Sequence, residues 1–173
     1  MLEELLSGPS GQALVHYLRS PETWLAVVVP GGLSLAILGF YFRQGKISRR
    51  LLLLWLAMLG LSCFCARWEI TAEAQQLYIY SAFSVACALL LFKRIYVAPA
   101  LAYALTFLAL WWVDMLHALH YALESGASIT GFYLGVGGAG AADALVLVPL
   151  LTAATVAYAA SRIRAQGERL AEL

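Results

Sequence analysis

Charged residues are scarce in this sequence. Its 173 residues include only 11 Lys and Arg and 10 Asp and Glu, while 62% are hydrophobic. Soluble domains carry roughly 25% charged and 45–50% apolar residues, so the composition excludes a soluble globular fold. The net charge is +1 and the basic residues are scattered between apolar segments. Because binding phosphates needs a basic patch, this distribution also excludes a nucleic-acid-binding surface.

The sequence also has few cysteines and no basic N-terminal region. The three cysteines, Cys63, Cys65 and Cys87, lie within apolar stretches and provide no disulfide framework. Cys63 and Cys65 would point about 160° apart on a helix, so they cannot share a ligand. Glu3 and Glu4 stand where a signal peptide has basic residues, and we therefore expect no cleaved leader.

Long apolar segments occupy most of the chain. They cover approximately residues 23–42, 51–68, 76–92, 95–122 and 131–160. A hydrocarbon core roughly 30 Å thick needs about 20 apolar residues in helical form, and only a helix or a closed barrel satisfies the backbone in lipid. The pattern predicts the all-α class, as a polytopic transmembrane bundle of five spans in one membrane domain.

The segments outside the spans are short. Residues 67–76 contain no Gly or Pro and are predicted to continue the helix or to form a tight helical hairpin. Residues 1–22 show helical spacing of Leu and Ala and are expected to form an external amphipathic segment that caps the bundle.

Lys and Arg are distributed unevenly over the two sides that five spans create. Nine lie in the 43–50 stretch, at 93–94 and in the C-terminal tail, all on one side, whereas Arg19 and Arg67 face the other side. Because Lys and Arg accumulate in cytoplasmic loops, the N-terminus is predicted outside and the C-terminus in the cytoplasm. The expected location is a cell membrane, the inner membrane in a bacterium, with the lipid bilayer as the first partner.

Four ionisable residues are predicted to gather near the outer ends of the last two spans. Asp114, His117 and His120 are spaced three apart and share one flank of the fourth span, and Asp143 lies at a comparable depth in the fifth. Ionisable groups inside a membrane are costly unless they are paired, hydrated or metal-bound. A functional site is therefore the first hypothesis for this cluster.

Three interpretations of the cluster stay open. Imidazole and carboxylate ligands suit a transition metal such as Zn, Cu or Fe. The carboxylates could instead relay protons or hold a transported cation. The third interpretation is structural, with each acid bonded to neighbouring helix groups, and it is favoured for His120. Haem is disfavoured, because its axial histidines usually come from two helices and His117 and His120 share one.

A second polar cluster follows the second span. Arg67, Glu69 and Glu73 would face the same compartment as the outer ends of the last two spans. Glu69 and Glu73 are spaced i and i+4, so they would lie on one helix face and could supply further oxygen ligands.

A glycine-rich run precedes the fifth span. Gly131, Gly135 and Gly138 are predicted to form a smooth face against which another helix or subunit packs. The alternative is that these glycines unwind the start of the span beside Asp143. The run lacks the Lys and Ser/Thr of a phosphate-binding loop.

These features favour a small integral membrane protein that is an accessory subunit of a larger assembly, with its Asp/His cluster contributing to a metal, proton or small-solute site. The alternative is a stand-alone transporter or an ion- or metal-binding membrane protein that acts as an oligomer. Small size favours the subunit, whereas the buried acids favour the transporter. Expected partners are other membrane subunits or further copies of the chain. No Ser lies beside a His or an acid in a nucleophile pattern, so catalysis has no support from the sequence.

Overall fold

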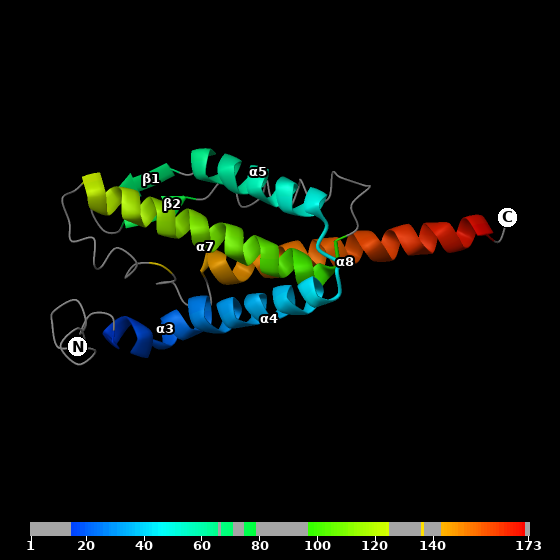
Figure 1. The fold of residues 1–173 in the computed structure, drawn as a ribbon, viewed down its shortest axis with the longest axis horizontal. Coiled ribbons are helices and arrows are strands. Elements are labelled where there is room, and N and C mark those ends of the chain that lie inside the picture. Colours follow the sequence, from blue (N-terminus) through cyan, green and yellow to red (C-terminus); the bar gives the residue numbers. More distant parts are fainter. Residues whose placement is uncertain are drawn as a thin grey trace.

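The chain folds as a bundle of long helices lying side by side (Figure 1). The fold is taken from a computed structural model that describes residues 15–65, 67–70, 75–78, 97–124, 136 and 143–171. Its principal helices are α4 (Val29–Arg43), α5 (Arg49–Cys65), α7 (Pro99–Glu124) and α8 (Ala144–Ala171). A helical fold is the arrangement that satisfies the backbone of so apolar a chain internally.

α4 continues a helical rod that begins at Pro21. α3 (Pro21–Thr23) and η1 (Trp24–Val28) precede it, and η1 is a π-helical turn in which the Val29 N–H donates to the Trp24 carbonyl. Pro30 accounts for this turn, because it has no N–H to donate to Ala26 and its ring crowds that carbonyl. Residues 15–19 form a further short helix, and the Tyr17 hydroxyl donates to the Val136 carbonyl at 2.8 Å.

Among the described residues, three helices are long and apolar enough to cross a membrane: Pro21–Arg43, Pro99–His120 and Ala144–Arg162. They correspond to the first, fourth and fifth predicted spans. α5 coincides with the second predicted span and has 17 residues, which corresponds to about 26 Å of helix at 1.5 Å per residue. The third predicted span, 76–92, lies outside the described residues except for its first three positions.

The prediction that residues 67–76 are helical is wrong. β1 (Arg67–Ile70) pairs antiparallel with β2 (Gln75–Tyr78), with Arg67 opposite Tyr78. The sequence of β1 alternates polar and apolar residues and contains Trp68 and Ile70, which are residue types that favour strands. α5 therefore ends at Cys65 and not near residue 68 as predicted.

The fifth predicted span begins too early. Val136 lies in a turn and Asp143 precedes α8, so the helix starts at Ala144 and not at residue 131. The helix also continues past the predicted end at residue 160, as far as Ala171, so its C-terminal part projects beyond the other helices (Figure 1).

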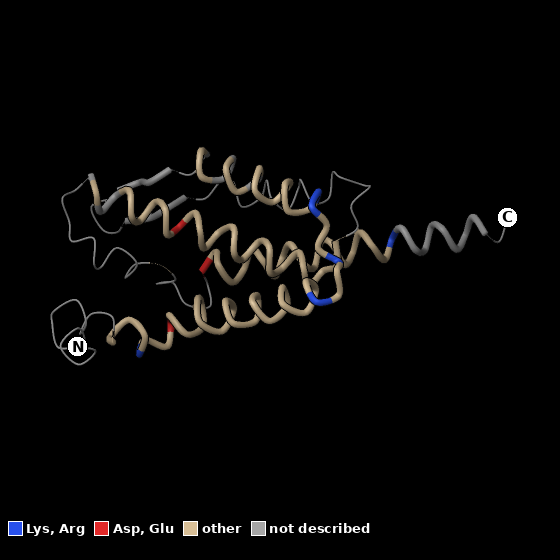
Figure 2. The backbone as a smooth tube through the Cα atoms, viewed as in Figure 1, with Lys and Arg blue, Asp and Glu red and all other residues tan. Residues whose placement is uncertain are grey.

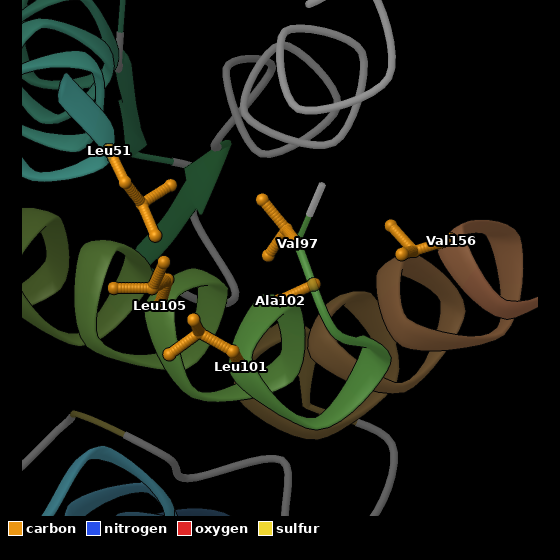
Figure 3. Packing of buried hydrophobic residues seen from close by; sticks show 6 residues of the cluster. All are labelled: Leu51, Val97, Leu101, Ala102, Leu105 and Val156. Atoms are coloured by element: carbon orange, nitrogen blue, oxygen red, sulfur yellow. The ribbon is translucent and has the colours of Figure 1, made fainter. Parts of the chain in front are cut away.

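α7 is the central helix of the bundle and contacts α4, α5 and α8. One buried cluster lies near its first turns and contains Leu51, Val97, Leu101, Ala102, Leu105 and Val156 (Figure 3). A second lies further along α7 and contains Phe107, Leu110, Ala118, Val136 and Leu145. Small buried residues such as Ala102, Ala104 and Ala109 let neighbouring helices approach α7 closely.

A polar contact also joins α5 to α7. The Trp55 indole N–H donates to the Leu105 carbonyl at 2.8 Å. An indole N–H in apolar surroundings requires such a partner, because water cannot provide one there. This contact fixes the position of α5 along the central helix.

A tight turn connects α4 to α5. The Lys46 N–H donates to the Tyr41 carbonyl at 3.1 Å and the Gly45 N–H to the Phe42 carbonyl at 3.0 Å. Gly45 has φ +64°, so the α4 end has the two hydrogen bonds and the left-handed residue of a Schellman motif. The Ser48 hydroxyl then accepts the Leu51 N–H at 3.1 Å and caps α5.

We predict that Gly45→Ala destabilises the protein by about 1–2 kcal/mol, because a left-handed backbone is unfavourable for a residue with a Cβ. Gly39→Ala is the matched control in α4, where an added Cβ meets nothing within 4 Å. This control should be neutral or should stabilise the helix by about 0.5–1 kcal/mol. Unfolding in detergent micelles, followed by circular dichroism, measures both effects. Equal effects of the two substitutions would contradict the role assigned to Gly45.

Candidate functional site: a carboxyl pair on α7 and α8

Asp143 lies directly before α8 and caps it. Its Oδ1 accepts the Leu145 N–H at 2.9 Å, and its backbone carbonyl accepts the N–H groups of Val146 and Leu147 at 3.0 Å each. Asp is a favoured residue at this position because its side chain satisfies an amide that has no partner within the helix. A carboxylate there also interacts favourably with the helix dipole. The structural interpretation of Asp143 is therefore supported by specific contacts.

Asp114 lies on α7, half-buried, next to the fully buried Val113. Its carboxyl group is close enough to that of Asp143 for the two charges to repel each other. The two helices are antiparallel, and the start of α8 lies beside the middle of α7 (Figure 1). The structure thus brings together the two acids that the sequence places on different spans. We refer to Asp114 and Asp143 as the carboxyl pair.

His117 is directed toward a different element. Its Nε2 lies 3.1 Å from the Cys63 carbonyl oxygen and donates to it in the tautomer that carries a proton on Nε2. Cys63 belongs to the last turn of α5, where carbonyl groups lack a partner within the helix. His117 therefore joins the end of α5 to α7. His120, one turn further along α7, is exposed.

The predicted metal site has no support in the described ranges. No three His, Cys, Asp or Glu side chains come close enough there to hold a metal ion, although Asp114, His117, His120 and Asp143 are all described. Of the predicted cluster, Asp114 and Asp143 interact electrostatically with each other, whereas His117 contacts α5.

Other predicted site residues lie in or near the hairpin. Arg67 and Glu69 belong to β1, opposite Tyr78 and Gln76 respectively. Glu73 lies outside the described residues. The predicted packing residues Gly131, Gly135 and Gly138 also lie outside them. The polar cluster and the glycine face stay predictions.

Buried hydroxyl groups are the polar feature that the sequence analysis missed. Ser34 Oγ and Thr106 Oγ1 are fully buried and have no hydrogen-bond partner in the part of the chain that the structure describes. Thr152 is also buried, and its hydroxyl donates to the Val148 carbonyl at 2.8 Å. A search for polar residues within the apolar stripe of each helix would have found them.

Comparison of the chain with protein-family models, with curated proteins and with solved structures finds no match. Two like-charged carboxyl groups in apolar surroundings are unfavourable unless a proton or another cation lies between them. Binding such a cation is the chemistry that this arrangement offers.

We predict that Asp143→Ala destabilises the protein by about 1 kcal/mol, the usual cost of losing a helix cap. Asp143→Asn keeps a side-chain oxygen for the Leu145 N–H and removes the repulsion with Asp114, so its stability should equal or exceed that of the wild type. Denaturant titration in micelles compares the two variants. The capping role would be contradicted by an Asn variant as unstable as the Ala variant.

Proposed function

We propose that the chain is an integral membrane protein of five spans with its N-terminus outside, and that its carboxyl pair takes up a proton in the outer half of the bundle. In this proposal it works as a subunit of a larger membrane assembly. The observation that carries the proposal is the convergence of Asp114 and Asp143 between helices whose other surfaces are apolar.

The exposed surface supports a membrane location. Large apolar side chains are exposed along the outside of the long helices, among them Leu33 (51%), Leu35 (64%) and Phe40 (58%) on α4 and Leu151 (66%) on α8. Apolar surfaces of this extent are rare on soluble monomers and are suited to lipid or to other membrane helices. In the described part of the chain, α4 and α8 pack mainly against α7, and the exposed apolar side chains on both helices leave surface for neighbouring subunits.

The charge distribution supports the orientation. Lys and Arg gather where α4 ends and α5 begins, at the end of the bundle from which the last part of α8 projects (Figure 2). The carboxyl pair lies away from this end. Because basic residues accumulate on the cytoplasmic side, the basic end belongs in the cytoplasm and the carboxyl pair near the outer face.

We predict that topology reporters fused to the two ends of the full chain report opposite sides of the membrane. The C-terminal fusion should be active in the cytoplasm and the N-terminal fusion outside, because five spans separate the ends. A third reporter inserted at Gly45 should be cytoplasmic. Both ends on one side would require an even number of spans and would overturn the five-span proposal.

The carboxyl pair is the group from which a proton-linked function is inferred. Asp143 also caps α8, yet its repulsion with Asp114 contributes nothing to that cap. A single proton bound by either acid neutralises one charge and removes the repulsion.

We predict that infrared spectra of the purified protein near neutral pH contain the C=O stretch of one protonated carboxylic acid. Asp114→Asn and Asp143→Asn should each abolish this band, because removing either charge removes the repulsion that favours the proton. Glu22→Gln is the matched control, since Glu22 is an exposed acid outside the pair. Absence of the band from the wild type, or its persistence in both Asn variants, would refute the proton site.

A further inference from the structure

We propose that the basic end of the bundle is a binding site for the headgroup of an anionic phospholipid. The basic end consists of Arg43, Lys46, Arg49, Arg50 and Arg162. The inference rests on the proposed membrane location, but not on the proton site, and it assigns a ligand to residues that the carboxyl pair does not involve.

Among the described residues, no acid neutralises the charge of the basic end. All five cationic side chains are exposed. The sequence contains no Asp or Glu from residue 23 to 68 or from 144 to 167. In the described part of the chain, none of the five forms an ion pair. Four of the five lie within eight residues around one turn, so they create a concentrated positive surface that attracts anions.

The fold holds these cations in place. The Schellman turn positions Lys46 so that its Nζ lies 5.9 Å from the centre of the Tyr41 ring. On α8 the Arg162 guanidinium lies 5.7 Å from the centre of the Tyr158 ring. Such cation–π contacts restrain the basic side chains beside aromatic rings, which are residues typical of the membrane–water interface. Cations from α4 and α5 therefore lie around one turn, and a cation of α8 lies further out at the same end of the bundle (Figure 2).

The depth of the site matches that of lipid headgroups. The candidate spans Pro21–Arg43 and Ala144–Arg162 both end at residues of the basic end. When these helices cross the bilayer, the guanidinium groups of Arg43 and Arg162 lie at the level of the phosphates. Arg binds phosphate oxygens through two parallel N–H groups, which favours a defined headgroup contact over a diffuse attraction.

Apolar surface beside the cations selects a lipid over a free anion. Phe42, which precedes Arg43 in α4, is 75% exposed, and Leu53, three residues after Arg50 in α5, is 67% exposed. Inorganic phosphate would leave these side chains uncovered. A phospholipid matches both parts of the surface, because its phosphate contacts the cations and its acyl chains cover the apolar residues.

We predict that the full chain in neutral detergent micelles binds phosphatidylglycerol at least tenfold more tightly than phosphatidylcholine, measured by native mass spectrometry. The fourfold variant R43Q/K46Q/R49Q/R50Q should lose this preference. Arg49→Lys with Arg50→Lys should keep most of it, because the charge remains. Arg19→Gln is the matched control at the opposite end of the bundle and should bind as the wild type does.

Each outcome decides the lipid proposal separately from the proposed function. An unchanged preference in the fourfold variant would overturn it, as would loss of the preference in Arg19→Gln. Displacement of phosphatidylglycerol by equimolar inorganic phosphate would show a free-anion site and would also overturn it. If the fourfold variant does not fold, R49Q/R50Q gives the same comparison with half of the charge removed. Binding in micelles does not depend on span number, so a failed topology test leaves this result interpretable.

Discussion

α7 contacts α4, α5 and α8, and both buried clusters of the bundle are formed on its surface. In lipid there is no hydrophobic force between helices, so close packing and a few polar contacts must hold them together. The small side chains of Ala102 and Ala109 let neighbouring helices approach α7 closely. The hydrogen bond from the Trp55 indole N–H to the Leu105 carbonyl provides a polar contact. The positions of α4, α5 and α8 therefore depend on this central helix.

The two ends of the bundle differ chemically because of how the helices run. α7 and α8 are antiparallel, which brings Asp114 to the start of α8, where Asp143 already caps the helix. At the opposite end the α4–α5 turn and Arg162 of α8 carry positive charge (Figure 2). One arrangement of helices therefore separates the two acids from a basic surface at one end of the bundle.

Several elements were predictable from local sequence. The apolar runs predicted the positions of α4, α5 and α7 to within a few residues, because a run of such residues has no other stable form in lipid. The convergence of Asp114 with Asp143 was also expected from their comparable depths. The hairpin of β1 and β2 was not expected, because the local sequence pattern of a strand does not identify the strand with which it pairs.

The site could be predicted only in part. The spacing of Asp114, His117 and His120 correctly placed them on one helix, yet spacing does not reveal the neighbouring element that each side chain meets. His117 contacts the end of α5, which no periodicity within α7 could indicate. The unpartnered hydroxyls of Ser34 and Thr106 were overlooked because burial depends on which helix covers them.

The sequence by itself determined that the chain is apolar, helical and basic at one end, because composition and charge placement act locally on each segment. Only the tertiary structure decided that Arg67–Tyr78 forms a hairpin, that His117 contacts α5 and that α7 lies at the centre. These are outcomes of strand pairing and helix packing, in which contacts form between separate segments of the chain and the register of one element against another selects the partners.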